Sequence, residues 1–355
     1  MKAAVWHGRQ DVRIQEVGDP PPPPPGQVQV EVAFCGICGT DLHEYFSGPI
    51  YIPVNAPHPL TGVRAPVITG HEMSGRIVAL GDGVEGFAVG DRVAGCPIVG
   101  CLECRWCKSN SMAQCDKVAF MGTSWTGGAL AERLNLNAYQ CYHLPDALSD
   151  EVAAMVEPFA STARPLMRAD VGPKDSVAIV GPGPIGLMSM KSAVIRGAKQ
   201  VVVVGRPGRR LELAKRGGAT EVIDIAAEDP LQRARQLTGG DGFDVVVECA
   251  GTPDGAHLAA QLTRTRGRLI LMGVFDKPAP LDLTDIVFRE KTVTGSMSGY
   301  GYFDQSIAQM TDPRFQGESL ITGRIRLDDL VKKGLGALLN EKGKHVKILV
   351  SPHAV

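Results

Sequence analysis

Apolar and polar residues alternate with period two in the first part of the chain. The alternation is clearest over residues 27–33, Gln-Val-Gln-Val-Glu-Val-Ala, and it predicts a half-buried strand. The proline run before it, Pro20–Pro25, lacks the N–H groups of a strand ladder and is therefore a connection. Short strands separated by glycine turns continue from residue 60 to residue 93. The pattern predicts an all-β core, rolled or barrel-like.

The spacing of apolar residues changes near residue 150 from that of strands to that of a helix. Ser149 can cap this helix, which is expected over residues 152–167. Beyond Ser176, apolar strands alternate with amphipathic helices. The expected strands are residues 177–180, 200–204, 222–224, 244–248 and 267–272, and the expected helices are residues 185–196, 209–216, 230–237 and 255–262. Repeated βαβ units of this kind give a doubly wound parallel sheet that is covered by helices on both faces.

Two domains account for this organisation, and a length of 355 residues is in keeping with two. We expect a β-rich domain from residues 1–152 and 296–355, because a further strand is predicted over residues 346–350. The doubly wound α/β domain then covers residues 153–295.

Charge and hydropathy exclude some classes of partner. The net charge of −1 argues against a general binder of nucleic acids or anionic membranes. No apolar run is long enough to span a bilayer, and the opening residues contain no apolar signal-peptide core. We therefore expect a cytoplasmic protein without a nucleic-acid or membrane partner.

Four of the nine cysteines lie close together, at Cys101, Cys104, Cys107 and Cys115. In a reducing compartment, an odd number with one tight cluster favours metal ligation over a disulfide framework. Four thiolates at C-x2-C-x2-C-x7-C spacing complete a tetrahedral shell with no open position. The spacing predicts a structural zinc ion in a lobe of about residues 96–116.

A second group mixes cysteine, histidine and carboxylate. Cys38 is followed by Thr40, Asp41 and His43, and His71 and Glu72 follow Gly70. Either Cys38 or His71 alone would more often be a core residue than a ligand. Together they predict an open, catalytic metal site.

The motif Gly181-Pro-Gly183-Pro184-Ile185-Gly186 joins an expected strand to an expected helix. Gly181 permits the tight turn, Gly183 lets the backbone approach a pyrophosphate, and Gly186 allows close packing of helix and strand. A helix is expected to begin at Ile185, directly after Pro184, and its N-terminus favours an anion, so both residues are candidates for the cofactor site. Because βαβ units surround it, the motif predicts a dinucleotide site.

The end of the second strand indicates which dinucleotide binds. NAD enzymes usually place Asp or Glu there, about twenty residues past the glycines, but this chain has Gly205 followed by Arg206. A guanidinium can bind a 2′-phosphate, so the residues favour NADP over NAD. Arg209 and Arg210 can add to that contact or lie solvated at the start of a helix.

Taken together, these motifs resemble those of the zinc-containing medium-chain alcohol dehydrogenases, in particular the polyol branch with sorbitol and 2,3-butanediol dehydrogenases. The stretch from Glu44 to Pro53 and the ending His345–Pro352 are similar to butanediol dehydrogenases. The resemblance covers essentially the whole chain. It implies a GroES-like catalytic domain beside a Rossmann-type domain, and a homodimer or homotetramer.

The resemblance also implies ligands for the catalytic zinc. Cys38 matches the first ligand and His71 the second, while Glu157 matches the position where polyol dehydrogenases carry a glutamate. Glu72 could ligate directly or through water, so the choice between the two carboxylates stays open. Asp41 resembles the carboxylate that orients the histidine ligand.

Three more roles are implied around the substrate and the cofactor. Thr40 and His43 match a proton relay from the substrate oxygen to solvent, and Lys347 resembles a basic residue near the pyrophosphate. Candidate pocket residues, which can equally be core or interface residues, are Tyr45, Phe46, Tyr51, Phe120 and Trp125.

The expected function is hydride transfer between a nicotinamide cofactor, NADP favoured, and a secondary alcohol, small diol or polyol, or the corresponding ketone. One alternative is an NAD-dependent sorbitol- or threonine-type dehydrogenase, in which another group replaces the missing acid. The other is a zinc- and nucleotide-binding sensor without turnover, against which the Thr40–His43 pair argues.

Overall fold

The computed structural model describes residues 1–341 and 343–353, and its chain divides into two compact units. The first unit contains residues 1–157, 303–307 and 321–355, and the second contains residues 158–302 and 308–320. The sequence placed the boundaries at 152/153 and 295/296 and did not anticipate that the chain crosses between the units twice more near its end. Within the described residues, no helix is both long and apolar enough to cross a membrane.

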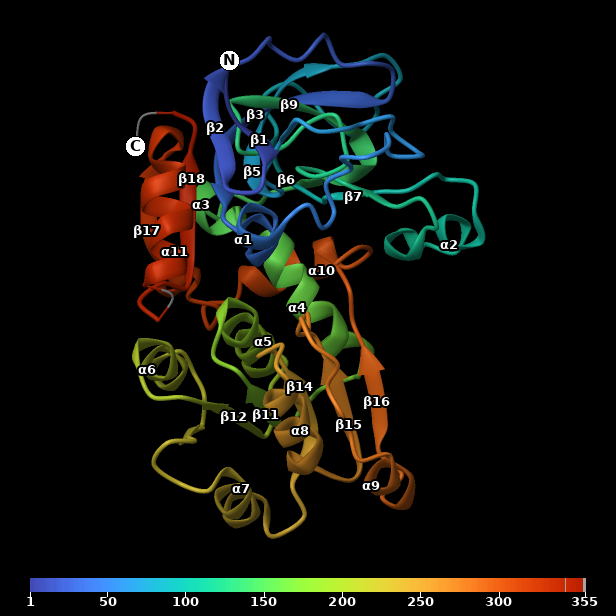
Figure 1. Ribbon diagram of the computed structural model, residues 1–355. Coiled ribbons are helices and arrows are strands. Elements are labelled where there is room, and N and C mark those ends of the chain that lie inside the picture. The colour runs from blue at the N-terminus through green and yellow to red at the C-terminus, as the bar shows by residue number, and fades with distance from the viewer. Residues whose placement is uncertain (342, 354–355) are drawn as a thin grey trace. The chain divides into compact units, whose positions relative to one another are not determined.

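The first unit is built on a seven-stranded sheet, shown at the top of Figure 1. Its strands are β3 (Gln27–Gly36), β5 (Glu72–Leu80), β6 (Arg92–Gly95), β9 (Arg133–Asn137), β10 (Cys141–His143), β17 (Ile321–Arg326) and β18 (Lys347–Ser351). They run in the order β10-β6-β5-β3-β18-β17, and β9 pairs with β3 as well. Val28, Val30 and Val32 of β3 are fully buried, as expected where period-two alternation turns one face of a strand into the core.

Smaller elements complete the first unit. A three-stranded sheet has the order β2-β1-β4, and β7 pairs with β8. Their bounds are β1 (Lys2–Gly8), β2 (Asp11–Glu16), β4 (Val67–Ile68), β7 (Ile98–Val99) and β8 (Ala119–Phe120). The helices are α1 (Gly39–Ser47), α2 (Arg105–Lys108), α3 (Asp150–Ala153) and α11 (Gly336–Asn340). Short 3-10 helices are η1 (Met112–Gln114), η2 (Ala138–Gln140) and η4 (Leu327–Asp329), and η5 (Leu330–Leu335) is a π-helix.

The second unit contains one parallel sheet of six strands in the order β13-β12-β11-β14-β15-β16. The strands are β11 (Ser176–Val180), β12 (Gln200–Gly205), β13 (Glu221–Asp224), β14 (Phe243–Glu248), β15 (Thr263–Leu271) and β16 (Thr292–Gly295). From β11 the chain moves outward to β13, returns to β14 beside β11, and continues outward to β16. This order confirms the predicted doubly wound sheet.

Helices connect the strands of this sheet and cover it, as the lower part of Figure 1 shows. They are α5 (Pro184–Ile195), α6 (Arg209–Arg216), α7 (Pro230–Thr238), α8 (Pro253–Leu262) and α9 (Leu283–Phe288), with η3 (Gly317–Leu320) near the end. Two helices cross the division of the chain, namely α4 (Val156–Arg168) and α10 (Phe303–Met310). The central strands are covered on both faces, and residues 201–204 of β12 are at most 1% exposed.

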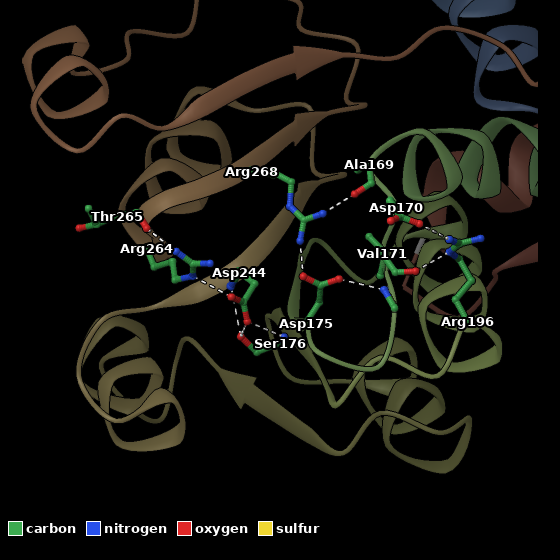
Figure 2. Close-up of polar contacts among 11 residues, drawn as sticks. Ala169, Asp170, Val171, Asp175, Ser176, Arg196, Asp244, Arg264, Thr265 and Arg268 are labelled. Carbon is green, nitrogen blue, oxygen red and sulfur yellow. Dashed lines mark hydrogen bonds and ion pairs between the residues drawn. The ribbon is translucent and has the colours of Figure 1, made fainter.

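A network of charged groups links residues near the amino ends of the parallel strands (Figure 2). The glycine motif follows the other end of β11. Asp244 at β14 accepts hydrogen bonds from the Ser176 backbone N–H at 2.8 Å, the Ser176 hydroxyl at 2.6 Å and Arg264 Nε at 2.7 Å. Arg268 of β15 donates to the Asp175 carboxylate and to the Ala169 carbonyl oxygen. The network ties three strands to the loop that precedes β11.

Replacing Asp244 with Asn should lower the free energy of unfolding by about 1.5–3 kcal/mol, the usual contribution of a hydrogen bond to a charged group. Burial acts to raise the pKa of Asp244, but the bonds from Ser176 and Arg264 lower it below its ordinary value. The stabilisation is therefore present above the unfolded-state pKa and is lost as the pH falls through the folded-state pKa. Urea unfolding followed by far-UV circular dichroism should show a smaller difference in the free energy of unfolding between Asp244→Asn and wild type at pH 3 than at pH 7.

The matched control is Asp170→Asn, because the Asp170 carboxylate is fully exposed and lies 3.8 Å from Arg196. This substitution should change stability by less than about 0.5 kcal/mol. Equal effects of the two substitutions would show that the network at Asp244 does not stabilise the sheet.

Candidate active site and cofactor loop

Cys38, His71 and Glu72 come together in the first unit, each placing one ligand atom within 4.8 Å of the others. Cys38 is the N-cap residue of α1, in an extended conformation, and its backbone N–H donates to Asp41 Oδ2 at 2.9 Å. His71 directly precedes β5, whose first residue is Glu72. Gly70 has a φ of 93°, and a Cβ there would come within 2.6 Å of Leu130, so the turn into His71 requires glycine.

The electrostatics of this group favour a cation. Burial acts to lower the pKa of His71, but the negative charges of Cys38, Asp41 and Glu157 raise it well above its ordinary value. Burial raises the pKa of Asp41, whose Oδ1 lies 4.0 Å from His71 Nδ1. A thiolate, an imidazole and a carboxylate are the donor types that bind zinc, so the residues present fit a zinc ion.

Glu72 has a second partner that the sequence did not reveal. Lys347 Nζ lies 2.8 Å from Glu72 Oε1 and 2.5 Å from Oε2, and it also donates to the Ile37 carbonyl oxygen at 3.2 Å. Both side chains are almost completely buried, at 3% and 1% exposure. Burial acts to lower the pKa of Lys347, but the charge of Glu72 raises it. The lysine expected near a pyrophosphate is thus engaged in an ion pair beside the candidate zinc ligands.

The other predicted residues lie around this group. Glu157, 9% exposed, lies near enough to raise the pKa of His71 but is outside the group of atoms within 4.8 Å. Thr40 is half-buried, with its hydroxyl oxygen 3.7 Å from Cys38 Sγ. His43, three residues further along α1, is exposed, and residues three apart share one face of a helix.

The four clustered cysteines also converge, with all their sulfur atoms within 4.8 Å of one another. None forms a disulfide. Backbone N–H groups point at the sulfurs: Cys104 N lies 3.3 Å from Cys101 Sγ, and Lys117 N lies 3.4 Å from Cys115 Sγ. A hydrogen bond from the Cys107 backbone lowers the pKa of Cys104 to about 6. Amide donors of this kind stabilise thiolates, the form that binds metal.

The glycine motif follows β11 in the second unit, as predicted. Gly181 has a φ of 100°, and a Cβ there would lie 2.8 Å from the Ala250 nitrogen. A Cβ on Gly186 would collide with the Gly181 carbonyl oxygen. Gly183, by contrast, is the N-cap of α5 and has open space around it, with Pro184 at the first helical position. A ligand can therefore approach the backbone at Gly183 and the free N–H groups of α5.

Sequence reasoning missed the contact between Pro182 and Gly205. A Cβ on Gly205, at the end of β12, would lie 2.6 Å from Pro182 Cγ, so only glycine lets the proline pack there. The signal was present in the proline of the glycine motif itself. Next to this contact Arg206 is exposed, and Arg210 is half-buried, with burial lowering its pKa.

The chain matches two families of known proteins. Residues 24–146 match the alcohol dehydrogenase GroES-like domain, and residues 184–312 match the zinc-binding dehydrogenase family. The chain is 37% identical to (R,R)-butanediol dehydrogenase of Bacillus subtilis (strain 168), covering 99% of this chain and 100% of the relative. It is 32% identical to sorbitol dehydrogenase of the same organism, covering 99% and 98%.

Solved structures agree with these relatives. The crystal structure of 2R,3R-butanediol dehydrogenase from Bacillus subtilis superposes with a TM-score of 0.93 at 37% identity, covering 99% of both chains. A zinc-binding dehydrogenase from Sinorhizobium meliloti 1021, bound to NADP, superposes with a TM-score of 0.88 at 28% identity, also covering 99% of both. With its fold and its Cys38–His71–Glu72 group, this chain belongs to the zinc-dependent medium-chain alcohol dehydrogenases and is an oxidoreductase of alcohols.

Proposed function

We propose that this enzyme transfers a hydride between NADP and a small secondary alcohol or vicinal diol of the 2,3-butanediol type. The observation that carries the proposal is the group formed by Cys38, His71 and Glu72 beside Thr40 on α1. Relatives named as butanediol and sorbitol dehydrogenases support a diol or polyol substrate. Steady-state oxidation of a panel of diols and simple alcohols with NADP and NAD tests the proposal.

Cys38, His71 and a carboxylate would hold Zn2+, which would supply the Lewis acid that oxidation of an alcohol requires. Both carboxylates remain in the proposed ligand set: Glu72 lies within the 4.8 Å group, and the charge of Glu157 acts on His71. Asp41 orients His71. The Cys101–Cys115 lobe holds a second, structural zinc ion in the same proposal.

Thr40 accepts the substrate proton and passes it outward in this proposal. Its half-buried hydroxyl near Cys38 and the exposed imidazole of His43 lie on one helix, so the proton moves from the metal group towards solvent. A histidine suits the last step because an imidazole can both accept and release a proton.

In the proposal, the backbone N–H groups of Gly183, Ile185 and Gly186 bind the pyrophosphate, and Pro184 begins α5 between them. Gly181 makes the turn that allows this approach. The resemblance places Lys347 near the pyrophosphate, and the proposal keeps it there. The carboxylate of Glu72 already balances the positive charge of Lys347. Arg210 adds to the phosphate site.

Arg206→Ala should raise the KM for NADP by about ten- to a hundredfold and leave the use of NAD nearly unchanged. The reason is the loss of a charge-assisted hydrogen bond to the 2′-phosphate, which contributes about 1.5–3 kcal/mol. The matched control is Arg216→Ala, an exposed arginine at the far end of α6, which should change neither KM. Comparison of kcat/KM with both cofactors is the measurement.

A shift of cofactor preference towards NAD requires two substitutions. Gly205→Asp would drive its Cβ into Pro182, so it is combined with Pro182→Ala, and the pair should shift preference towards NAD. A wild-type enzyme that prefers NAD by tenfold or more would contradict the NADP assignment while leaving the dehydrogenase assignment intact.

The proposal includes a homodimer or homotetramer. Within the described residues, β16 pairs with β15 only, so its outer edge is unpaired. Next to this edge in the sequence, α9 exposes Leu283, Val287 and Phe288 at 70%, 69% and 82%. An unpaired edge strand with nearby apolar side chains suits a second copy of the same chain. Light scattering should show an oligomer for wild type and a smaller species for Phe288→Asp, whereas a wild-type monomer would contradict the proposal.

A further inference from the structure

Lys191 of α5 is buried to 1% exposure. A lysine is seldom fully buried unless an anion pairs with it. Within residues 1–341 and 343–353, no carboxylate oxygen lies at ion-pair distance from its Nζ, and its hydrogen-bond partner is Gln316 Oε1 at 3.4 Å. The second unit thus contains a buried amine that the proposed function does not use.

Two parts of the chain enclose this amine. Gly217, the C-cap of α6, lies against it, because a Cβ there would be 3.2 Å from Lys191 Nζ. Gln316 belongs to residues 308–320, which rejoin the second unit after residues 303–307 have belonged to the first. We call residues 308–320 the strap, because the chain continues into the first unit at both of its ends.

Side chains of the strap hold it on α5. The Ser192 hydroxyl, next to the buried lysine, donates to Gln309 Oε1 at 2.9 Å. Arg314 donates to the carbonyl oxygens of residues 194 and 195 at 3.3 and 3.0 Å, near the end of α5. The ring of Phe315, 1% exposed, packs against α4. The strap therefore covers the part of α5 that carries the amine.

Charged residues next to these contacts are exposed or paired elsewhere. They are Arg196, Lys215, Arg216, Asp312, Arg314 and Glu318. Asp312 pairs with Arg314 at 2.6 Å, and Arg196 lies 3.8 Å from Asp170. Burial lowers the pKa of Lys191 to about 8, as expected for an amine that is removed from water without an opposite charge.

We propose that Lys191 and the strap form a pH-sensitive switch, in which the strap is held firmly on α5 when the amine is neutral and loosely when it is protonated. Release of the strap lets water reach the amine. Water stabilises the protonated form far more than the neutral form, so protonation favours release. The inference depends on neither the substrate nor the cofactor.

The direction of the pH dependence follows from the two pKa values. The pKa of Lys191 is about 8 under the seated strap and returns to its ordinary value of 10.5 when the strap is released. Below about pH 8 both forms are protonated, so the strap is held weakly and to a constant extent. Between pH 8 and pH 10.5 the released form binds more protons, and the strap is held about tenfold more firmly for each pH unit.

The switch acts on the part of the chain between its last two entries into the first unit, at residues 303–307 and from residue 321 onwards. A seated strap fixes both neighbouring connections. Oxidation of an alcohol by a nicotinamide cofactor releases a proton, so its equilibrium moves towards the ketone as the pH rises. The strap is held most firmly in the same range of pH.

Hydrogen exchange of the full chain, followed by mass spectrometry at pH 7 and pH 9.5, tests the switch. After correction for the intrinsic exchange rate at each pH, amides of the strap should be protected about 30-fold more strongly at pH 9.5 than at pH 7. Amides of β14, in the same unit, should show no such increase. Equal increases in the strap and in β14 would indicate a global change and overturn the proposal.

Lys191→Met and Gln316→Glu should both abolish the increase, for opposite reasons. Methionine has no charge to bury, so strap protection should be at least as high at pH 7 as in wild type at pH 9.5. Glutamate at the exposed position 316 gives the protonated amine a partner and so removes the reason for release. Lys199→Met, at an exposed lysine of the same unit, is the matched control and should keep the wild-type increase.

The two variants keep the proposal open to refutation even if one of them fails to fold. Equal strap protection at pH 7 and pH 9.5 in the wild-type protein overturns the proposal. An increase of wild-type size in a folded Lys191→Met or Gln316→Glu protein overturns it as well, because the pH dependence would then come from another group.

Discussion

We expect His71→Ala to abolish alcohol oxidation and to remove one zinc ion per chain. The imidazole is one of three donors within 4.8 Å, and two remaining donors hold an exchangeable ion poorly. Lewis-acid stabilisation contributes several kcal/mol, so turnover should fall about a thousandfold or more. Zinc content by plasma emission spectrometry, measured together with kcat, gives the readout.

Two further substitutions show whether the effect of His71→Ala comes from loss of the catalytic metal. Cys104→Ser should also remove one zinc ion, but from the cysteine lobe, and should leave the Cys38–His71–Glu72 group able to bind metal. Thr40→Ala should keep both ions and still lose about 100- to 10,000-fold in rate, because it removes proton transfer alone. A wild-type enzyme that is fully active with one zinc per chain would count against the two-site arrangement.

Lys347→Met should lower the free energy of unfolding of the first unit by about 3–5 kcal/mol, the second large effect. The substitution leaves Glu72 buried at 1% exposure without its cation, and removing one partner of a buried pair is strongly destabilising. The three tryptophans, Trp6, Trp106 and Trp125, all lie in the first unit. Urea unfolding followed by tryptophan fluorescence therefore reports on the unit that carries the pair.

The double variant Lys347→Met with Glu72→Gln should recover part of the loss, because the buried charge is gone. Lys333→Met is the matched control: Lys333 pairs with Asp329 at 3.0 Å, but its side chain is 60% exposed, so the cost should stay below about 1 kcal/mol. If Lys347→Met were no more costly than Lys333→Met, the ion pair with Glu72 would not stabilise the unit.

Local patterns in the sequence were sufficient for much of the fold. The alternation over residues 27–33 predicted β3 because one buried face imposes period two on a strand. The motif beginning at Gly181 could be placed between a strand and a helix because each of its glycines meets a local steric demand. The spacing from Cys101 to Cys115 likewise encodes a short turn, and the sulfur atoms do converge.

What the sequence did not reveal depends on tertiary contacts. Glu72 and Lys347 are 275 residues apart, and no local rule joins them. Glu44 was noticed only as part of a stretch, because its partners are backbone amides, which leave no signature in the side chains. The domain boundaries differ for a similar reason: α4 and α10 are continuous helices, while the division of the chain depends on what each end packs against.

The packing of Pro182 on Gly205 has an evolutionary consequence. An acid at position 205 is sterically blocked while Pro182 remains, so a descendant of this chain can acquire one only after position 182 has changed. The order of the two mutations is thereby constrained: the proline substitution comes first, as a step that need confer no advantage of its own. A change of coenzyme preference through an acid at position 205 would therefore depend first on a residue that carries no charge and offers no hydrogen-bond donor.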